Sequence, residues 1–215
     1  QYHREQRLER QKAQLDQFAS FVSHDLRNPL GIARTYLDFA RESGDNDDFE
    51  AVEEALERMD TMIEDLLTMA RADSIVDETE SVAVSGLADD AWGTVQTDGA
   101  TLKKETTDTI VEADRDLLRN VFENVFRNAR EHNDGPLTVT VGSLEDDSGF
   151  FIADDGTGIP EEKRDEALEQ GYSTSEEGSG LGLSIVGGIV DAHGWELAIT
   201  EARDAGARFE FRTGK

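Results

Sequence analysis

The first third of the chain carries apolar residues at the spacing of amphipathic helices. Residues 1–42 hold two apolar stripes with a stutter where they meet, near residues 18–26. After a polar loop signal at 43–47, apolar positions recur in alternating steps of three and four, which indicates a coiled-coil seam. The stripes comprise Leu8, Leu15, Phe18 and Val22, then Leu26, Leu30, Ala33, Leu37 and Ala40, and the seam comprises Phe49, Val52, Leu56, Met59, Ile63, Leu66 and Ala70. Residues 1–72 are therefore predicted to form a helical hairpin.

One such hairpin cannot bury both of its apolar stripes. A second copy related by a two-fold axis would cover them and complete a four-helix bundle. We therefore expect a homodimer, with residues 1–72 as the dimerisation domain.

The pattern changes after a short polar stretch at 73–80, which we interpret as a linker. Helices are expected over 87–95, 114–131 and 181–192. Strands are expected over 109–111, 137–141, 150–153, 197–200 and 207–211. This mixture predicts an α+β domain over 81–215, and thus a chain of two domains.

Acidic residues outnumber basic ones by 48 to 21, and the formal net charge is −27. Such a charge repels nucleic acid and anionic lipid, so no nucleic-acid partner is expected. Because the acids are spread over every segment, we interpret them as a halophilic adaptation to a high-salt cytoplasm, where screening weakens self-repulsion. The absence of cysteine excludes disulfides and thiolate metal sites. No apolar run approaches the roughly 20 residues of a membrane span.

A histidine, His24, stands on the predicted first helix, two residues from both Val22 and Leu26. Helical geometry points it away from the apolar stripe, where a nucleotide can reach it. Asp25 can accept a hydrogen bond from one ring nitrogen and leave the other as a nucleophile. Asn28 lies one turn further along the same face. An ordinary surface histidine beside an aspartate would give the same pattern.

Two asparagines, Asn124 and Asn128, lie one turn apart on the helix predicted over 114–131. Their side-chain carbonyls suit a hydrated Mg²⁺ ion, which takes few protein ligands when phosphates supply the rest. A plain polar helix face would look the same.

Two glycine-containing segments follow. Asp154 ends a predicted strand, and Gly156 and Gly158 after it allow a tight turn and close backbone approach. A buried carboxylate there can bind an adenine amino group, although a simple acidic turn has the same composition. The segment 178–183 opens a predicted helix, where backbone N–H groups can bind phosphate. It is neither a Walker A loop nor a Rossmann fingerprint.

In their order and spacing these segments resemble the core of the sensor histidine kinases, from about residue 15 to 212. The segment around His24 resembles the H-box of the HisKA dimerisation and phosphoacceptor domain. Four further segments resemble boxes of the ATP-binding HATPase_c domain, namely 124–129 the N-box, 154–158 the G1 box, 168–174 the F-box and 178–183 the G2 box. The resemblance implies a Bergerat-type (GHKL) α/β sandwich, shared with gyrase, Hsp90 and MutL ATPases, with ATP and Mg²⁺ as ligands.

The resemblance also implies roles for single residues. Asn128 would bind Mg²⁺ with Asn124 in support, and Asp154 would hold adenine. The other implied nucleotide contacts are Gly156, Gly158, Gly178, Gly180, Leu181 and Gly182. In the first domain, Asp25 would act as base or orienter for His24. Asn28 stands where the family places a residue used to dephosphorylate the partner.

The chain departs from the family at several positions. The family often has a lysine where Glu131 stands, so phosphate contact is expected from His132, Arg130 or Arg127. Leu168 replaces the F-box aromatic. Trp195 stands where a second glycine is usual, and His193 is expected to end a helix capped by Gly194.

The implied activity is that of a protein histidine kinase in a two-component system. It would use Mg-ATP to phosphorylate His24 and pass the phosphoryl group to an aspartate of a response-regulator receiver domain, with regulator phosphatase activity as a hypothesis. Two alternatives remain open, a GHKL-type ATPase clamp and a catalytically silent dimeric scaffold. We expect a cytoplasmic core whose upstream sensor, absent from this sequence, could anchor the full-length protein in a membrane.

Overall fold

The computed structural model describes residues 26–72, 76, 78–95, 99–105, 109–133, 135–164, 166–168, 181–203 and 205–214. Contacts divide the chain into two compact units, Gln1–Glu64 and Asp65–Lys215. The described residues of the first unit are mostly helical, and the second unit combines helices with strands. Among the described helices, none is both long enough and apolar enough to cross a membrane.

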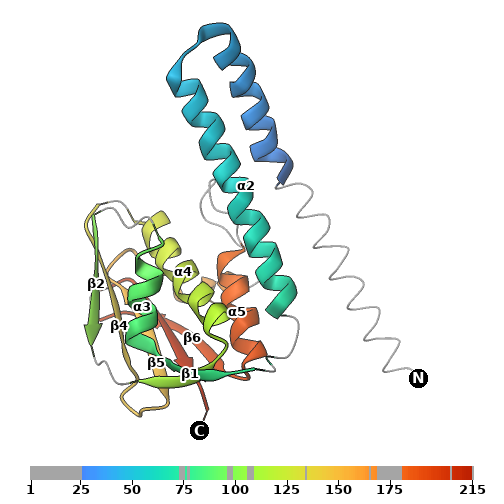
Figure 1. The fold of residues 1–215 in the computed structure, drawn as a ribbon. Helices are drawn as coiled ribbons and strands as arrows, with labels where there is room; N and C mark the ends of the chain where they lie inside the picture. Colours follow the sequence, from blue (N-terminus) through green and yellow to red (C-terminus); the bar gives the residue numbers. More distant parts are fainter. Residues whose placement is uncertain are drawn as a thin grey trace. The chain divides into compact units, whose positions relative to one another are not determined.

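Two helices joined by a short turn make up the described part of the first unit (Figure 1). The first covers residues 26–43 and α2 covers Asn46–Ala72, whose last turns belong to the second unit. The chain reverses at Gly44, whose φ of 69° lies in the left-handed region that favours glycine. Its N–H donates to the Ala40 carbonyl at 2.9 Å and so closes the first helix. The predicted helical hairpin is confirmed over these residues.

Small side chains form most of the buried face of the hairpin. The hydrophobic side chains with at most 6% exposure are Ala33, Ala40, Ala55 and Met62. The seam predicted along α2 lies beside this face, because Phe49, Leu56 and Ile63 are 45%, 49% and 43% exposed. Larger apolar side chains thus form a second, uncovered stripe, which the sequence pattern alone did not separate from the first.

A five-stranded sheet packed against three helices forms the second unit (Figure 1). In order across the sheet the strands are β2 Ala100–Glu105, β4 Leu137–Ser143, β5 Gly149–Asp154, β7 Ala207–Arg212 and β6 Glu196–Glu201. The helices are α3 Val84–Trp92, α4 Arg115–Glu131 and α5 Gly182–Ala192. Strand β2 runs parallel to β4, and the other neighbours are antiparallel. This α/β sandwich confirms the predicted α+β class.

Shorter elements complete the second unit. Strand β1, Glu80–Ala83, pairs antiparallel with β3, Ile110–Ala113, in a separate two-stranded sheet. Two 3-10 helices, η1 at Glu161–Lys163 and η2 at Glu166–Leu168, follow β5. Ala167 of η2 is buried, and η2 contacts α5.

Aromatic stacking centres the core on Phe150 of β5. Its ring centroid lies 4.7 Å from that of Phe211 and 5.5 Å from that of Phe122, both stacked, and Trp195 meets it edge-on at 6.3 Å. Trp195 therefore has a packing role at the position where a glycine is usual. Because every residue of β5 is buried, the strand carries Asp154, its last residue, into the interior.

The imidazole of His193 connects the end of α5 to the residue that precedes α4. His193 ends α5 as predicted, and Gly194 after it has a φ of 68°. Its Nε2 accepts the backbone N–H of Asp114 at 3.0 Å, and its Nδ1 lies 2.7 Å from the Ile189 carbonyl. The residue therefore does more than end a helix, since it joins two elements across the core.

Strands β1 and β2 were not predicted, and α3 differs from the expected range of 87–95. Strand β2 has only two apolar residues, the half-buried Ala100 and Leu102, and ends in three exposed charged ones, so its alternation is too short to mark a strand. Helix α3 starts at Val84 and ends at Trp92. The hydroxyl of Thr94 donates to the Ala91 carbonyl at 2.8 Å and occupies an acceptor that a longer helix would use.

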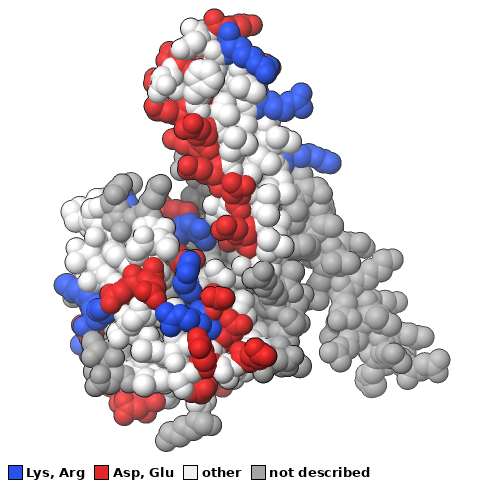
Figure 2. Space-filling model, in the orientation of Figure 1, with Lys and Arg blue, Asp and Glu red and all other residues white. Residues whose placement is uncertain are grey.

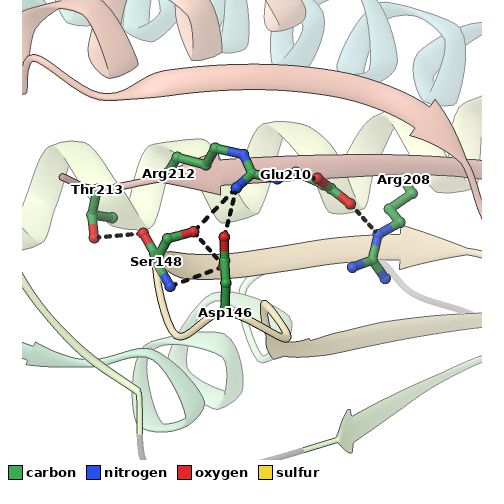
Figure 3. A network of polar contacts seen from close by, with 6 residues as sticks. All are labelled: Asp146, Ser148, Arg208, Glu210, Arg212 and Thr213. Atoms are coloured by element: carbon green, nitrogen blue, oxygen red, sulfur yellow. Dashed lines mark hydrogen bonds and ion pairs between the residues drawn. The ribbon is translucent and has the colours of Figure 1, made fainter.

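A polar network at the start of β5 holds the β4–β5 turn to β7 (Figure 3). Asp146 accepts the Ser148 hydroxyl at 2.6 Å and pairs with Arg212 at 3.0 Å. The bonds from Ser148, helped by Arg212, lower the pKa of the Asp146 carboxyl. Since Asp154 lies at the opposite end of β5, this network stabilises the sheet far from the glycine-containing segments.

Candidate functional site

The predicted site residues fall into described and undescribed groups. His24, Asp25, Gly178 and Gly180 lie outside the described residues. Asn28 lies on the first helix of the hairpin and is exposed. The other predicted residues belong to the second unit, where α4, the end of β5 and the start of α5 carry them.

Helix α4 owes its position to a capped start and a strongly amphipathic sequence. The carboxylate of Asp114 accepts the N–H groups of Asp116 and Leu117, each at 3.0 Å, which satisfies two donors of the first turn. One face buries the residues Leu117, Leu118, Val121, Phe122, Val125, Phe126 and Ala129 against the sheet and neighbouring helices. The helix is therefore held firmly enough to fix the direction of its polar side chains.

Asn124 is 4% exposed and hydrogen-bonded at both ends of its amide. Its Nδ2 donates to the Asn120 carbonyl at 2.9 Å, and its Oδ1 accepts from Arg127 at 2.8 Å. The same Arg127 guanidinium lies 3.7 Å from the carboxylate of Asp65. These bonds hold the Asn124 side chain in one orientation.

Asn128 is different, because its buried Nδ2 has no hydrogen-bond partner among the described residues. Leaving such a group unpaired typically costs about 1–3 kcal/mol, and buried polar atoms without a partner call for an explanation. A ligand that binds the amide would remove this cost. Among the described residues, Asn128 is therefore the one whose side chain most directly indicates a ligand-binding role.

Gly182, the first residue of α5, lies directly against these two amides. A Cβ built on it would sit 3.0 Å from Asn124 Oδ1 and 3.5 Å from Asn128 Nδ2. The buried side chain of Leu181 precedes it and anchors the helix start. The start of α5, whose first N–H groups have no acceptor within the helix, thus meets the polar face of α4, which is a favourable place for phosphate.

Asp154 is 8% exposed at the end of β5, and burial raises the pKa of its carboxyl. Both of its described hydrogen bonds go to Oδ1, from the N–H of Gly156 at 2.9 Å and from that of Ala207 at 3.3 Å. These two bonds favour the ionised form and partly oppose the effect of burial on the pKa. The carboxylate is thus oriented by the backbone and can present Oδ2 to a ligand.

The two glycines after Asp154 lie where a side chain would collide. Gly158 has a φ of 71°, and a Cβ on it would lie 2.9 Å from the Gly206 carbonyl oxygen. A Cβ on Gly156 would come within 2.2 Å of the Asn133 side chain. At both positions another part of the chain therefore approaches the glycine backbone too closely to leave room for a side chain, which is the reason for expecting glycine here.

The cationic candidates for phosphate contact are held by other groups. Arg130 donates to the backbone carbonyl of Asn133 at 2.9 Å, and Arg127 binds Asn124. His132 ends α4, and its charge opposes the effect of burial by favouring a lower pKa of the Asp154 carboxyl. Within the described residues, Arg130 therefore has a structural partner and His132 lies near the Asp154 end of the site.

Sequence reasoning missed the residues that support the loop after β5. The side chain of Asn133 accepts the N–H of Thr157 at 2.7 Å. Asp155 accepts the N–H of Thr138 at 2.7 Å, and its own N–H donates to the Thr138 carbonyl at 3.2 Å. Asn133 and Asp155 lie in loops without a spacing pattern, so their roles could not be read from the sequence.

The arrangement combines a buried, oriented carboxylate with paired amides at a helix start. The buried carboxylate suits a hydrogen-bond donor on an otherwise apolar ring, such as a purine amino group. The paired amides at the helix start suit phosphate oxygens and a hydrated divalent cation. Because α4 contacts α5 through Gly182 and the loop after β5 through Asn133, both halves share one scaffold.

Comparison with known families matches both parts of the chain. Residues 14–75 match the model of the His Kinase A (phospho-acceptor) domain, HisKA. Residues 113–214 match the model of the histidine kinase-, DNA gyrase B- and HSP90-like ATPases, HATPase_c. The two matches are separate and follow one another along the chain.

Individual relatives and a solved structure agree with these matches. Sporulation kinase C of Bacillus subtilis is 27% identical over 95% of this chain and 51% of its own length. The probable sensor histidine kinase TcrY of Mycobacterium tuberculosis is 31% identical over 86% of this chain and 43% of its own length. The chain thus spans about half the length of these relatives. The histidine kinase AdeS of Acinetobacter baumannii has a similar fold, with a TM-score of 0.67 at 18% identity, covering 89% of this chain and 97% of the solved one.

Proposed function

Because the chain belongs to the sensor histidine kinases, with their phospho-acceptor and ATP-binding domains in that order, we propose that it phosphorylates its own His24 with Mg-ATP. The observation that carries the proposal is the meeting of the α5 start with the paired amides of α4, in a unit that also holds the buried carboxylate of Asp154. This arrangement is suited to a nucleotide held at both its base and its phosphates.

At the adenine end, Asp154 would accept a hydrogen bond from the exocyclic amino group. Its Oδ1 is already occupied by two backbone N–H groups, so Oδ2 is the atom left to face the base. A guanine would present a carbonyl oxygen instead and repel the carboxylate, so the site should discriminate strongly in favour of ATP. Gly156 and Gly158 would let the backbone approach the ring.

At the phosphate end, Asn128 would hold Mg²⁺ with Asn124 in support. Asn128 fits this role because its buried amide lacks a described partner, and rotation about its last bond can present either the oxygen or the nitrogen. Bound Mg²⁺ would neutralise charge on the phosphates. Gly182 and Leu181 would bring backbone N–H groups to the phosphate oxygens, with Gly178 and Gly180 extending that segment.

Residues of the first domain would carry the chemical step. A ring nitrogen of His24 attacks the γ-phosphorus as the bond to the ADP oxygen breaks, and Asp25 orients the ring or takes its proton. The enzyme contributes mainly by holding the reactants in line. The phosphohistidine would then donate to an aspartate of a response-regulator receiver domain, and Asn28 is a candidate for the reverse, phosphatase reaction.

We further propose a homodimer built on the hairpin. The two helices of the hairpin carry a set of exposed, large apolar side chains. These are Leu30, Ile32, Tyr36 and Phe39 on the first helix and Phe49, Leu56, Ile63 and Leu67 on α2. Burying them in a four-helix bundle would remove a large apolar surface from water. Since ATP is a cytoplasmic metabolite, we propose that this core lies in the cytoplasm. We also propose that adaptation to high salt is the reason for the net charge of −27.

Incubation with ATP labelled on the γ-phosphate tests the proposal against its rivals. Protein-bound label that resists alkali, is lost in acid and disappears in His24→Ala supports the kinase. Hydrolysis of ATP without label would favour an ATPase clamp, and failure to bind nucleotide would favour a silent scaffold. Addition of candidate receiver domains to the labelled protein then tests phosphotransfer.

A further inference from the structure

Asn133, the residue that follows the last turn of α4, links two parts of the proposed nucleotide site. Its Nδ2 donates to the Ala129 carbonyl at 2.7 Å, and its Oδ1 accepts the N–H of Thr157 at 2.7 Å. Its backbone carbonyl accepts from Arg130 at 2.9 Å. One carboxamide thus binds the end of α4 and the loop after β5 at the same time.

The contact between Asn133 and the loop is tight. A Cβ on Gly156 would lie 2.2 Å from Asn133 Oδ1 and 2.3 Å from Nδ2, so the amide lies flat against bare backbone. Gly156 itself donates to Asp154 at 2.9 Å. The loop that follows Asp154 is therefore in direct contact with the end of α4 through this amide, while the carboxylate itself is held by the backbone N–H groups of Gly156 and Ala207.

Besides Asn133, the loop is supported from the sheet side and by one longer bond, which the Thr157 hydroxyl donates to the His132 carbonyl at 3.5 Å. Asp155 is bonded to Thr138 at the start of β4, and Gly158 lies against Gly206 before β7. Asn133 connects the loop to α4 instead, the helix that bears Asn124 and Asn128. It thus joins the adenine end of the proposed site to its phosphate end.

We propose that Asn133 is a positioning residue, whose carboxamide sets the spacing between the loop that binds adenine and the helix that binds the phosphates. The inference rests on the proposed ATP site and names a residue on which its geometry depends. A ligand that spans both ends requires the correct spacing, whereas a ligand that occupies only the adenine end does not.

Titration calorimetry of the whole chain with Mg-ADP and with adenosine tests this. Asn133→Ala removes both side-chain hydrogen bonds of this bridge. If the lost spacing costs the ligand about as much as one neutral hydrogen bond, Mg-ADP binding should weaken about five- to tenfold and adenosine binding by less than about twofold. Asn133→Asp keeps the acceptor for Thr157 but loses the donor to Ala129, so it should resemble Asn133→Ala. In autophosphorylation assays both variants should raise KM for ATP more than they lower kcat.

Arg212→Ala is the matched control, because it breaks a comparable polar bridge at the opposite end of β5. It should lower the melting temperature and leave both dissociation constants unchanged. Equal loss of ADP and adenosine affinity in Asn133→Ala, or no loss of either, would overturn the inference. Failure of the unmodified chain to bind Mg-ADP would instead overturn the proposed function, so the two failures are distinguishable.

Discussion

Gly182 lies so close to Asn124 that a Cβ on the glycine would come within 3.0 Å of the amide oxygen. Gly182→Ala should therefore push the start of α5 away from α4 and weaken Mg-ADP binding, by about tenfold if one good phosphate contact is lost. Calorimetric titration measures the effect.

The same helix offers the control for this substitution. Gly187 has open space around its Cβ position. Gly187→Ala should raise the free energy of unfolding by about 0.5–1 kcal/mol through helix propensity and leave the affinity for nucleotide unchanged. Equal effects of the two alanines on binding would count against the assigned contact.

The two asparagines of α4 should respond differently to truncation. Asn124→Ala removes the partners of Arg127 and of the Asn120 carbonyl, and should lower the free energy of unfolding by about 1–2 kcal/mol. Asn128→Ala removes an amide nitrogen that lacks a described partner, so it should cost less than about 0.5 kcal/mol. Urea denaturation without ligand compares them.

Ligand binding should reverse the order of these effects. Mg-ADP should raise the melting temperature of the unmodified chain, and Asn128→Ala should abolish that rise although its own stability is intact. A full rise in Asn128→Ala would remove this residue from the proposed Mg²⁺ site.

The buried carboxyl of Asp154 should make stability depend on pH. Its folded-state pKa is raised by burial above the ordinary value of 3.8, so the folded state holds its proton to higher pH than the unfolded state does. Stability contributed by this group is therefore full below 3.8 and falls as the pH rises toward the folded pKa. Asp154→Asn removes this dependence and should be at least as stable as the parent at neutral pH, as denaturation across the pH range would show.

Nucleotide binding should behave in the opposite way in the same variant. An asparagine keeps Oδ1 for Gly156 and Ala207 but turns an N–H group toward the adenine amino group. Asp154→Asn should thus fold well and bind ATP poorly. Strong binding in this variant would contradict the adenine assignment.

The uncovered apolar stripe of α2 should control association. Leu56 is 49% exposed in one protomer, so Leu56→Glu should convert a dimer into monomers with little loss of helix. Analytical ultracentrifugation measures the mass, and Glu57→Gln, an exposed neighbour, is the control. A monomeric parent chain, or a Leu56→Glu variant that remains dimeric, would argue against this interface.

The net charge of −27 should make folding depend on salt. Raising chloride from about 0.1 to 1 M shortens the screening length from about 10 to 3 Å, and the melting temperature should rise. Equal ionic strengths of chloride and sulfate separate screening from the exclusion of sulfate from protein surfaces. A melting temperature that is independent of salt would remove the case for high-salt adaptation.

The sequence by itself determined the elements with strong periodicity. Helix α4 was predicted within one residue of its observed start, because Asp114 provides a cap and apolar residues follow at helical spacing. The pairing of β4 with β5 was also predictable from alternation and proximity in the chain. Asp154 was predicted as a buried carboxylate because it ends an apolar strand before two glycines.

Only the tertiary structure decided which distant groups meet. The sequence showed one apolar seam on α2, but Ala55 and Met62 are the buried apolar residues of that helix, while Phe49, Leu56 and Ile63 remain exposed. Burial depends on the neighbouring helix, which the sequence of α2 does not specify. Strand β2 has only a short apolar alternation at Ala100 and Leu102, and its pairing with β4 is what identifies it as a strand. Asn133 and His193 make their decisive bonds to residues far along the chain, and such contacts leave no periodic signal because they depend on the folding of the segments between.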